Sequence, residues 1–182
     1  VVRLLPADRA MLNLAQGLDD GCLSRITGLT KTYPNIRQIP EISLERDFVV
    51  FSKRSDIGVK DWQSLKPYNV AFITGWKILE RNVTEAKSIT HVKNGEQLFQ
   101  LLENDRVDLI IYNRWGGLQI AKELGLDSVR VLAPPLVTVP HYFYLNKQHE
   151  HLVTKASIAL QEIKRDGAYQ EIFDATLKPL KQ

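Results

Sequence analysis

Apolar positions along the chain follow two spacings, one helical and one extended. The first five residues, 1–5, are mostly apolar and predict a short strand, after which Pro6 opens a helix at a position where its missing N–H costs nothing. Met11 and Leu18 belong to one apolar stripe at helical spacing. The helix that carries this stripe is expected to end near Gly17. This pattern predicts that the chain begins with a strand and an amphipathic helix.

The rest of the chain alternates short apolar runs with helical patterns. In chain order the predicted elements are an extended run 42–53, strand 69–73, helix 75–81, strand 89–92, helix 94–104, strand 107–112 and helix 114–124. Two extended pieces follow at 129–132 and 141–146, with Pro134-Pro135 between them, and two helices close the chain before Pro179. Strands that alternate with helices of this size indicate an α/β fold with a parallel sheet.

Composition narrows the class of protein without naming a function. Of 182 residues, 44% are hydrophobic and 25% are charged, which is typical of an ordinary globular protein and excludes a disordered one. The single Cys22 excludes a disulfide framework, and no apolar stretch is long enough for a spanning helix. A net charge of +3 without a Lys/Arg block argues against nucleic acid as a partner.

Sequence motifs for catalysis, metal binding or cofactor binding are missing. The four histidines include no pair at the spacing that puts two metal ligands on one helical face, so we expect no metal site. The chain has no nucleophile elbow, no P-loop and no dinucleotide-binding glycine motif, so we expect no cofactor. Cys22 fits a small buried apolar residue better than a nucleophile. The sequence therefore predicts a protein that is not an enzyme.

Several segments, in register, resemble type 2 periplasmic solute-binding proteins, the extracellular solute-binding protein family 3 that includes the receptors for polar amino-acid uptake. The C-terminal signature of that family is similar to 145–147, 152–155, 159–164, 166–169 and 172–173. The entry to its second lobe is similar to 61–65 followed by 69–75, and its next helix and strand resemble 97–108. A branch of small stand-alone members resembles the helix with Pro6, Arg9 and Ala10 and the turn 17–21.

This resemblance implies two α/β lobes, each a mostly parallel sheet flanked by helices and joined by two crossover strands. The first lobe would comprise 1–52 plus 147–182, and the second 53–146. The lobes would capture a small solute between them by a hinge motion at about residues 52–54 and 146–148. The implied location is the periplasm of a Gram-negative bacterium, and the implied protein partner is a membrane permease or a signalling protein.

One departure from the family concerns its first strand and helix. Family members begin with a strand, a ligand-reaching loop and a helix that all precede anything matching Val1. The first lobe is therefore expected to be incomplete, and an incomplete sheet has an open edge that can pair with another chain. On this basis we expect a homodimer formed through the first lobe.

The loop Thr74-Gly75-Trp76-Lys77 is the first candidate for ligand binding. It follows a strand of the predicted sheet and starts a helix, and ligands of open α/β sheets bind outside the carboxyl ends of the strands. Its free N–H groups suit an anion such as a carboxylate. In the family a small hydroxyl residue usually follows this glycine, so Trp76 favours stacking or a narrower cleft. The alternative is structural: Thr74 caps the helix and Trp76 packs between the lobes.

Asn113, Arg114 and Arg25 complete the candidate ligand-binding residues. Amino-acid receptors of the family usually carry an aspartate at the position of Asn113 for the ligand's ammonium, and an amide cannot supply that charge. The alternative role for Asn113 is to cap the helix that starts at Arg114. Arg25 lies near the place of a carboxylate-binding arginine, and a solvated surface arginine is its alternative. If these cations and Lys77 line the cleft, an anionic ligand without an amino group is favoured.

Three functions remain open at this point. The first is capture of an amino acid or carboxylate for uptake. The second is ligand sensing as the extracytoplasmic domain of a signalling receptor. The third is a degenerate member that has lost its ligand and acts as an interaction protein.

Overall fold

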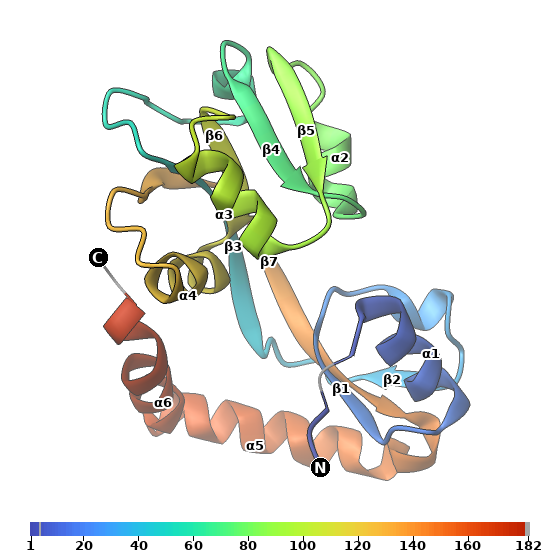
Figure 1. The fold of residues 1–182 in the computed structure, drawn as a ribbon. Coiled ribbons are helices and arrows are strands. Elements are labelled where there is room, and N and C mark those ends of the chain that lie inside the picture. The colour runs from blue at the N-terminus through green and yellow to red at the C-terminus, as the bar shows by residue number, and fades with distance from the viewer. Residues whose placement is uncertain (4, 181–182) are drawn as a thin grey trace. The chain divides into compact units, whose positions relative to one another are not determined.

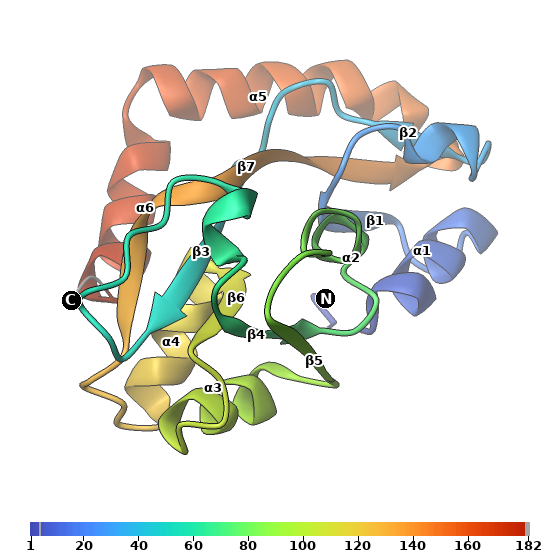
Figure 2. The same ribbon diagram turned by 90° about the horizontal axis from the view of Figure 1, so that it is seen from above.

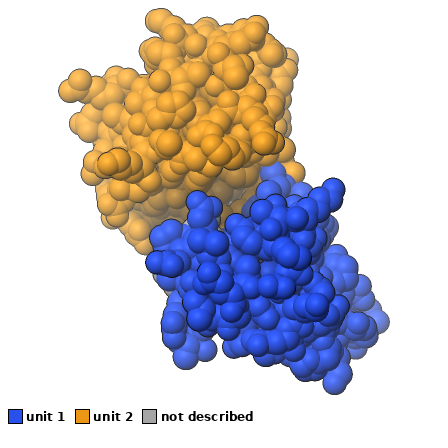
Figure 3. All heavy atoms as spheres, turned by 90° about the vertical axis from the view of Figure 1, so that its right-hand side faces the viewer, with its two compact units in different colours: residues 1–45, 139–175 blue, residues 46–138, 176–182 orange. Residues whose placement is uncertain are grey.

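The chain divides into two compact units, which Figure 3 distinguishes by colour. The computed structural model describes residues 1–3 and 5–180. Unit 1 comprises 1–45 and 139–175, and unit 2 comprises 46–138 and 176–182. The resemblance implies two functional lobes, the first with the limits 1–52 plus 147–182 and the second with the limits 53–146. These lobe limits stay a prediction.

Unit 2 is built on the part of the sheet in which strands β3, β6, β4 and β5 lie side by side in that order (Figure 1). The strands are β3 (Leu44–Ser52), β4 (Asn69–Ile73), β5 (Ser88–Val92) and β6 (Leu109–Asn113). β4 runs parallel to both β5 and β6, whereas β3 is antiparallel to β6. Because β4, β5 and β6 are parallel, their carboxyl ends lie at one edge of the sheet and their amino ends at the opposite edge.

Helices cover both faces of this sheet (Figures 1 and 2). The elements are the 3-10 turn η2 (Trp62–Leu65), α2 (Lys77–Asn82), α3 (Gly95–Glu103), α4 (Arg114–Glu123) and the short turn η4 (Lys178–Leu180). Buried residues of α3 and α4, such as Phe99 and Leu118, pack with Phe51 on one face. Leu65 of η2 and Leu79 of α2 pack with Phe72 on the other. Both sheet faces are therefore buried, as the continuous apolar runs predict.

Unit 1 combines two short strands, which pair with the second half of the last strand, with several helices. Its elements are α1 (Ala7–Gln16), β1 (Gly21–Arg25), η1 (Leu29–Lys31), β2 (Ile36–Gln38), the second half of β7 (Arg130–Asn146), η3 (Lys147–Leu152), α5 (Val153–Arg165) and α6 (Ala168–Leu177). β1 and β2 both pair with β7 antiparallel. Met11, Leu14, Ile36 and Tyr144 form its buried core with Cys22.

Most predicted elements are present within a few residues of their expected limits. Strand 69–73 is β4, and helix 114–124 is α4. Gly17 ends α1 in the left-handed region with φ +73, a conformation that glycine adopts without steric cost. Among the described residues, no helix combines the length and apolar character that crossing a membrane requires. The α/β fold predicted from the sequence is confirmed.

Two local predictions are wrong. The first was a strand at 1–5: the described residues of that segment have no regular structure, and Leu4 lies outside the described residues. Val1 and Val2 are exposed, so their apolar character does not reflect a place in the sheet. The second was a break at Pro134: β7 continues through it as one strand of 17 residues. Proline removes an N–H donor, but its fixed φ suits extended backbone.

Candidate functional site

The loop between β4 and α2 is held by backbone contacts to the neighbouring strand. The N–H of Thr74 donates to the carbonyl of Val92, at the end of β5, over 2.9 Å. Gly75 has φ +86, and a side chain there would find open space. Only the left-handed backbone therefore requires glycine at this position. Thr74 and Gly75 are both exposed, so the loop is accessible at the carboxyl edge of the sheet.

Two groups of this loop that could hold an anion, the N–H of Gly75 and the ammonium of Lys77, are bonded to Glu80 of α2. The N–H of Gly75 donates to Glu80 Oε1 over 2.7 Å, and Lys77 Nζ lies 2.7 Å from Oε2. The hydrogen bond from Lys77, and then the one from Gly75, hold the pKa of Glu80 below its ordinary value. One carboxylate of the chain itself therefore occupies both donors.

Trp76 lies in an aromatic cluster with Phe48 and Tyr112. Its indole stacks on the Tyr112 ring with centroids 4.9 Å apart, and it meets Phe48 edge-on at 5.5 Å. All three side chains are partly buried, and burial raises the pKa of the Tyr112 phenol. Phe48 comes from β3, Trp76 from the loop after β4, and Tyr112 from β6. The contacts among the three rings therefore fix the position of the loop on the sheet.

Asn113 and Arg114 join β6 to α4 and are bonded to their own unit. Asn113 Oδ1 accepts the N–H of Gly116 over 2.8 Å, so the side chain caps α4. Arg114 Nε donates to Asp47 Oδ2 over 2.9 Å, and Thr138 Oγ1 donates to the other oxygen of that carboxylate over 2.7 Å. The capping role weighed for Asn113 is therefore present, and the charge of Arg114 is paired.

Arg25 lies in unit 1, at the end of β1. Its Nη1 donates to the carbonyl of Ser24 over 3.1 Å, whereas its Nε is buried and has no hydrogen-bond partner. Ser24 has φ +60, its Oγ is also buried without a partner, and the pairing register of β1 slips between Cys22 and Arg25. Bulges, strained backbone and unpaired buried polar atoms concentrate at functional sites, which keeps Arg25 among the candidates.

The structure brings six of the seven predicted residues together in one unit. Thr74, Gly75, Trp76 and Lys77 follow β4, and Asn113 and Arg114 follow the neighbouring parallel strand β6. Both segments therefore lie at the carboxyl edge of the sheet, and the stacking of Trp76 on Tyr112 joins them. Arg25 belongs to the other unit and is described there by itself. Whether these residues bind a ligand stays a prediction.

Sequence reasoning missed four side chains around these residues: Asp47, Phe48, Glu80 and Tyr112. Glu80 follows Lys77 by three residues, a spacing at which helical side chains interact, so this ion pair had a signal in the sequence. Tyr112 was counted only as part of an apolar strand, and Asp47 is 67 residues from Arg114 along the chain. No local pattern could have indicated that last pair.

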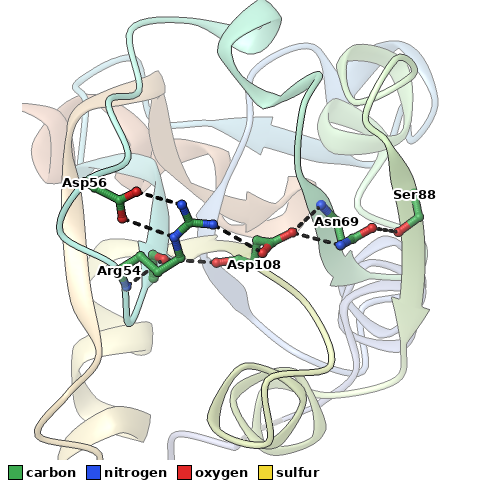
Figure 4. A network of polar contacts seen from close by, with 6 residues as sticks. Arg54, Asp56, Asn69, Ser88 and Asp108 are labelled. Carbon is green, nitrogen blue, oxygen red and sulfur yellow. Dashed lines mark hydrogen bonds and ion pairs between the residues drawn. The ribbon is translucent and has the colours of Figure 1, made fainter.

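The opposite, amino edge of the sheet carries a network of polar contacts (Figure 4). Asp108 Oδ2 accepts both the backbone N–H and the side-chain amide of Asn69, over 2.9 and 2.8 Å. Ser88 Oγ donates to Asn69 Oδ1 over 2.8 Å. Arg54 makes two hydrogen bonds to Asp56 and lies 3.7 Å from the other oxygen of Asp108. These contacts connect the starts of β4, β5 and β6, so we expect them to stabilise the sheet.

Features typical of enzymes are not found in the described part of the chain. Cys22 is buried in the core of unit 1, and burial raises the pKa of its thiol, which makes it a poor nucleophile. His149 Nε2 lies 2.8 Å from Asp20 Oδ1, a pair rather than a metal site. Among residues 1–3 and 5–180 there is no group of three or more side chains placed to hold a metal ion.

Comparison of the sequence with known proteins gives one distant relative. No protein-family model matches the chain. An uncharacterized protein from Shewanella oneidensis is 26% identical over 174 residues, which are 92% of this chain and 66% of that protein. The chain therefore spans slightly less than two thirds of the length of this relative.

Comparison of the structure gives a consistent set of neighbours. The GluR0 ligand-binding core in complex with L-glutamate has a TM-score of 0.79 at 13% identity, covering 97% of this chain and 80% of that one. A putative binding component of an ABC transporter from Wolinella succinogenes, complexed with lysine, has a TM-score of 0.79 at 16% identity, covering 97% and 78%. A histidine kinase sensor domain with similarity to periplasmic binding proteins has a TM-score of 0.73 at 17% identity, covering 96% and 77%. At these identities the likeness concerns the fold, and the chain has the α/β fold of periplasmic solute-binding proteins.

Proposed function

We propose that this protein is a non-enzymatic, extracytoplasmic binding protein that captures a small polar solute, amino-acid-like or a carboxylate, for uptake. The observation that carries the proposal is the fold, which nearly the whole chain shares with proteins whose structures hold L-glutamate and lysine. The implied location is the periplasm, and the implied transport partner is a membrane permease.

The carboxyl edge of the sheet in unit 2 supports the proposal. Ligands of open α/β sheets bind outside the carboxyl ends of the strands, and the loops after β4 and β6 lie there. Those loops carry the aromatic Trp76 and polar groups, which is the usual composition of a small-molecule site.

The charges around these loops favour some solutes over others. Lys77 is paired with Glu80, and Arg114 with Asp47, so the two cations are balanced by two carboxylates. A balanced surface attracts a dianion less than two unpaired cations would. We therefore favour solutes that are neutral, zwitterionic or singly charged over dicarboxylates.

A thermal-shift screen tests the proposal. The panel contains L-lysine, L-arginine, L-glutamate, L-glutamine, agmatine, succinate and glycerol. A ligand at 100 times its Kd stabilises a protein by about 2.7 kcal/mol, which for this length raises the Tm by roughly 5–10 °C. A selective shift with one or two members is the expected result, and no shift with any amino acid, amine or carboxylate would contradict the proposal.

A matched pair of variants ties such a shift to the site. Trp76→Phe changes the aromatic ring of the candidate loop, and we expect it to reduce the ligand-induced shift by more than half. Trp62→Phe makes the same change in η2, which lies near Arg81 and Asn82 at the C-terminal end of α2, and should leave the ligand-induced shift unchanged. Equal effects of the two variants would remove Trp76 from the site.

Ligand sensing is the second candidate function, and the likeness to a histidine kinase sensor domain favours it. Uptake and sensing differ in what a deletion of the gene removes. Loss of uptake of the radiolabelled ligand from the medium indicates transport. Unchanged uptake with loss of a ligand-dependent transcriptional response indicates sensing.

The homodimer expected from the sequence stays a proposal beside these functions. β1 is an edge strand of the sheet, and Leu23 within it is exposed. The register slip and the positive φ of Ser24 interrupt that edge, which weakens strand pairing. Sedimentation of the protein at high concentration distinguishes a dimer from a monomer.

A further inference from the structure

A cavity of about 280 Å³ lies at the C-terminal end of α2, within unit 2. It is formed by η2, by the last residues of α2 and by the segment 83–86 that leads to β5. None of the seven candidate ligand-binding residues is among the described residues that line it. Its volume is close to the lower limit of ordinary ligand pockets, roughly 300 Å³, so the cavity suits a small molecule.

The apolar part of the cavity combines a buried base with one accessible ring. Leu65 and Val83 line the cavity, and both belong to the buried core on this face of the sheet. Trp62 packs against the same core but is only partly buried, so its indole is held by packing and still borders the cavity. A fixed, half-buried indole offers a flat surface on which another planar ring can stack.

The charged side chains of the cavity leave one cation without a partner. Glu85 Oε2 lies 2.7 Å from Lys66 Nζ, and the hydrogen bond and the charge of that ammonium hold the pKa of Glu85 below its ordinary value. In the described part of the chain, no ion pair or hydrogen bond engages the side chain of Arg81. The acid is therefore neutralised within the chain, whereas the exposed guanidinium is available to an anion.

A role at the helix end is the alternative for Arg81. The residue lies in the last turn of α2, where a cation interacts favourably with the free carbonyl groups. That role would explain a positive charge at this position. It accounts neither for the cavity nor for the partly exposed indole that lines it.

We propose that this cavity binds a small aromatic carboxylate, whose ring stacks on Trp62 and whose carboxylate pairs with Arg81. The planar fork of an arginine matches the two oxygens of a carboxylate. An aliphatic acid lacks the stacking and a neutral aromatic compound lacks the ion pair, so both bind more weakly. The inference goes beyond the proposed function, because it assigns a second site with its own class of ligand.

Three probes of similar size test the two contacts separately. NMR follows the backbone amide signals of residues 81–86 at about pH 7 during titration with benzoate, benzamide and cyclohexanecarboxylate. Benzamide keeps the ring without the charge, and cyclohexanecarboxylate keeps the charge without the aromatic ring. We expect a Kd on the order of 1 mM for benzoate and at least about fivefold weaker binding of the other two. If either of the two binds as tightly as benzoate, the inference is wrong.

A matched pair of variants assigns the charge to one arginine. We expect Arg81→Gln to weaken benzoate binding at least about fivefold and to leave the binding of benzamide unchanged. Arg106→Gln is the control, since Arg106 is an exposed arginine of unit 2 that is not among the described residues lining the cavity. It should bind benzoate like the unmodified chain. An equal loss in both variants, or no loss in Arg81→Gln, would overturn the inference.

The outcome is separable from that of the proposed function. The thermal-shift panel contains no aromatic compound, so Trp62→Phe serves as its control whether or not this cavity binds benzoate. If benzoate changes no signal of residues 81–86 while circular dichroism shows an intact fold, Arg81 serves only the end of α2 and the inference is overturned. A benzoate response centred on the loop 74–77 would also overturn it.

Discussion

The two edges of the sheet in unit 2 both carry polar side chains, but they use them differently. At the amino edge Asp108, Asn69 and Ser88 are bonded to one another across three strands (Figure 4). At the carboxyl edge the bonds of Gly75 and Asn113 return to the helix that each loop begins.

This difference separates stability from binding. Breaking a contact of the amino edge removes a connection between strands. Exchanging the Glu80 contact at the carboxyl edge for a ligand leaves every strand paired as before. We therefore expect substitutions at the amino edge to change the free energy of unfolding alone, and those at the carboxyl edge to change ligand affinity together with smaller changes in stability.

The largest effect is expected at Asp108. Asp108→Ala leaves the N–H and the amide of Asn69 without their acceptor at a partly buried position, and we expect a loss of about 2 kcal/mol in the free energy of unfolding. Denaturation by urea measures this as a lower midpoint with an unchanged slope.

A control at the same edge is Asp56→Ala. Asp56 pairs with Arg54 at a largely exposed position, and we expect a loss below about 0.5 kcal/mol. If Asp108→Ala is no more destabilising than Asp56→Ala, the amino edge is not the structural network described above.

An intermediate effect is expected at Asn113. Asn113→Ala removes the cap of α4 and should cost about 1 kcal/mol of stability, whereas Asn113→Asp retains a capping oxygen and should cost less than about 0.5 kcal/mol. The aspartate also introduces a negative charge, so calorimetry should show tighter binding of ligands with an ammonium group. Equal stability losses in the two variants would argue that the cap contributes nothing.

The smallest effect is expected from the pH dependence of Glu80. Its pKa is lower in the folded chain than its ordinary value of 4.5, mainly because of Lys77, so its contribution to stability is present above that value. It is lost as the pH falls through the folded pKa. The Tm of the unmodified chain should exceed that of Glu80→Gln at about pH 6, and the difference should shrink progressively as the pH falls below 4.5. A difference that is constant over this range would mean that the ionised form makes no favourable contact.

The predictable part of this site is the part that local pattern determines. Strand 69–73 and helix 114–124 followed from apolar runs and caps, and together they place the loops with Gly75 and Asn113 at one edge of the sheet. The capping role of Asn113 was also predictable, because an asparagine directly before a helix usually accepts an N–H of its first turn.

The rest depends on contacts that no local pattern encodes. The bond from Glu80 to Gly75 requires φ +86 at the glycine and one particular rotamer of the glutamate. The stacking of Trp76 on Tyr112 depends on the pairing of β4 with β6, which are separated by a strand and two helices along the chain. A positively charged site was expected because the sequence places Lys77 and Arg114 near the loops. The structure pairs each of these cations with a carboxylate, so the charge is balanced.

NMR mapping of the backbone amides of the uniformly labelled chain, during titration with L-lysine, L-glutamate and agmatine, locates the binding site on the sheet of unit 2. We expect the largest changes at the carboxyl edge, in the loop 74–77 and around Asn113, and no change beyond noise at Asn69, Ser88 and Asp108. Changes concentrated at the amino edge, or the absence of changes in the loop 74–77 with a compound that stabilises the protein, would contradict it.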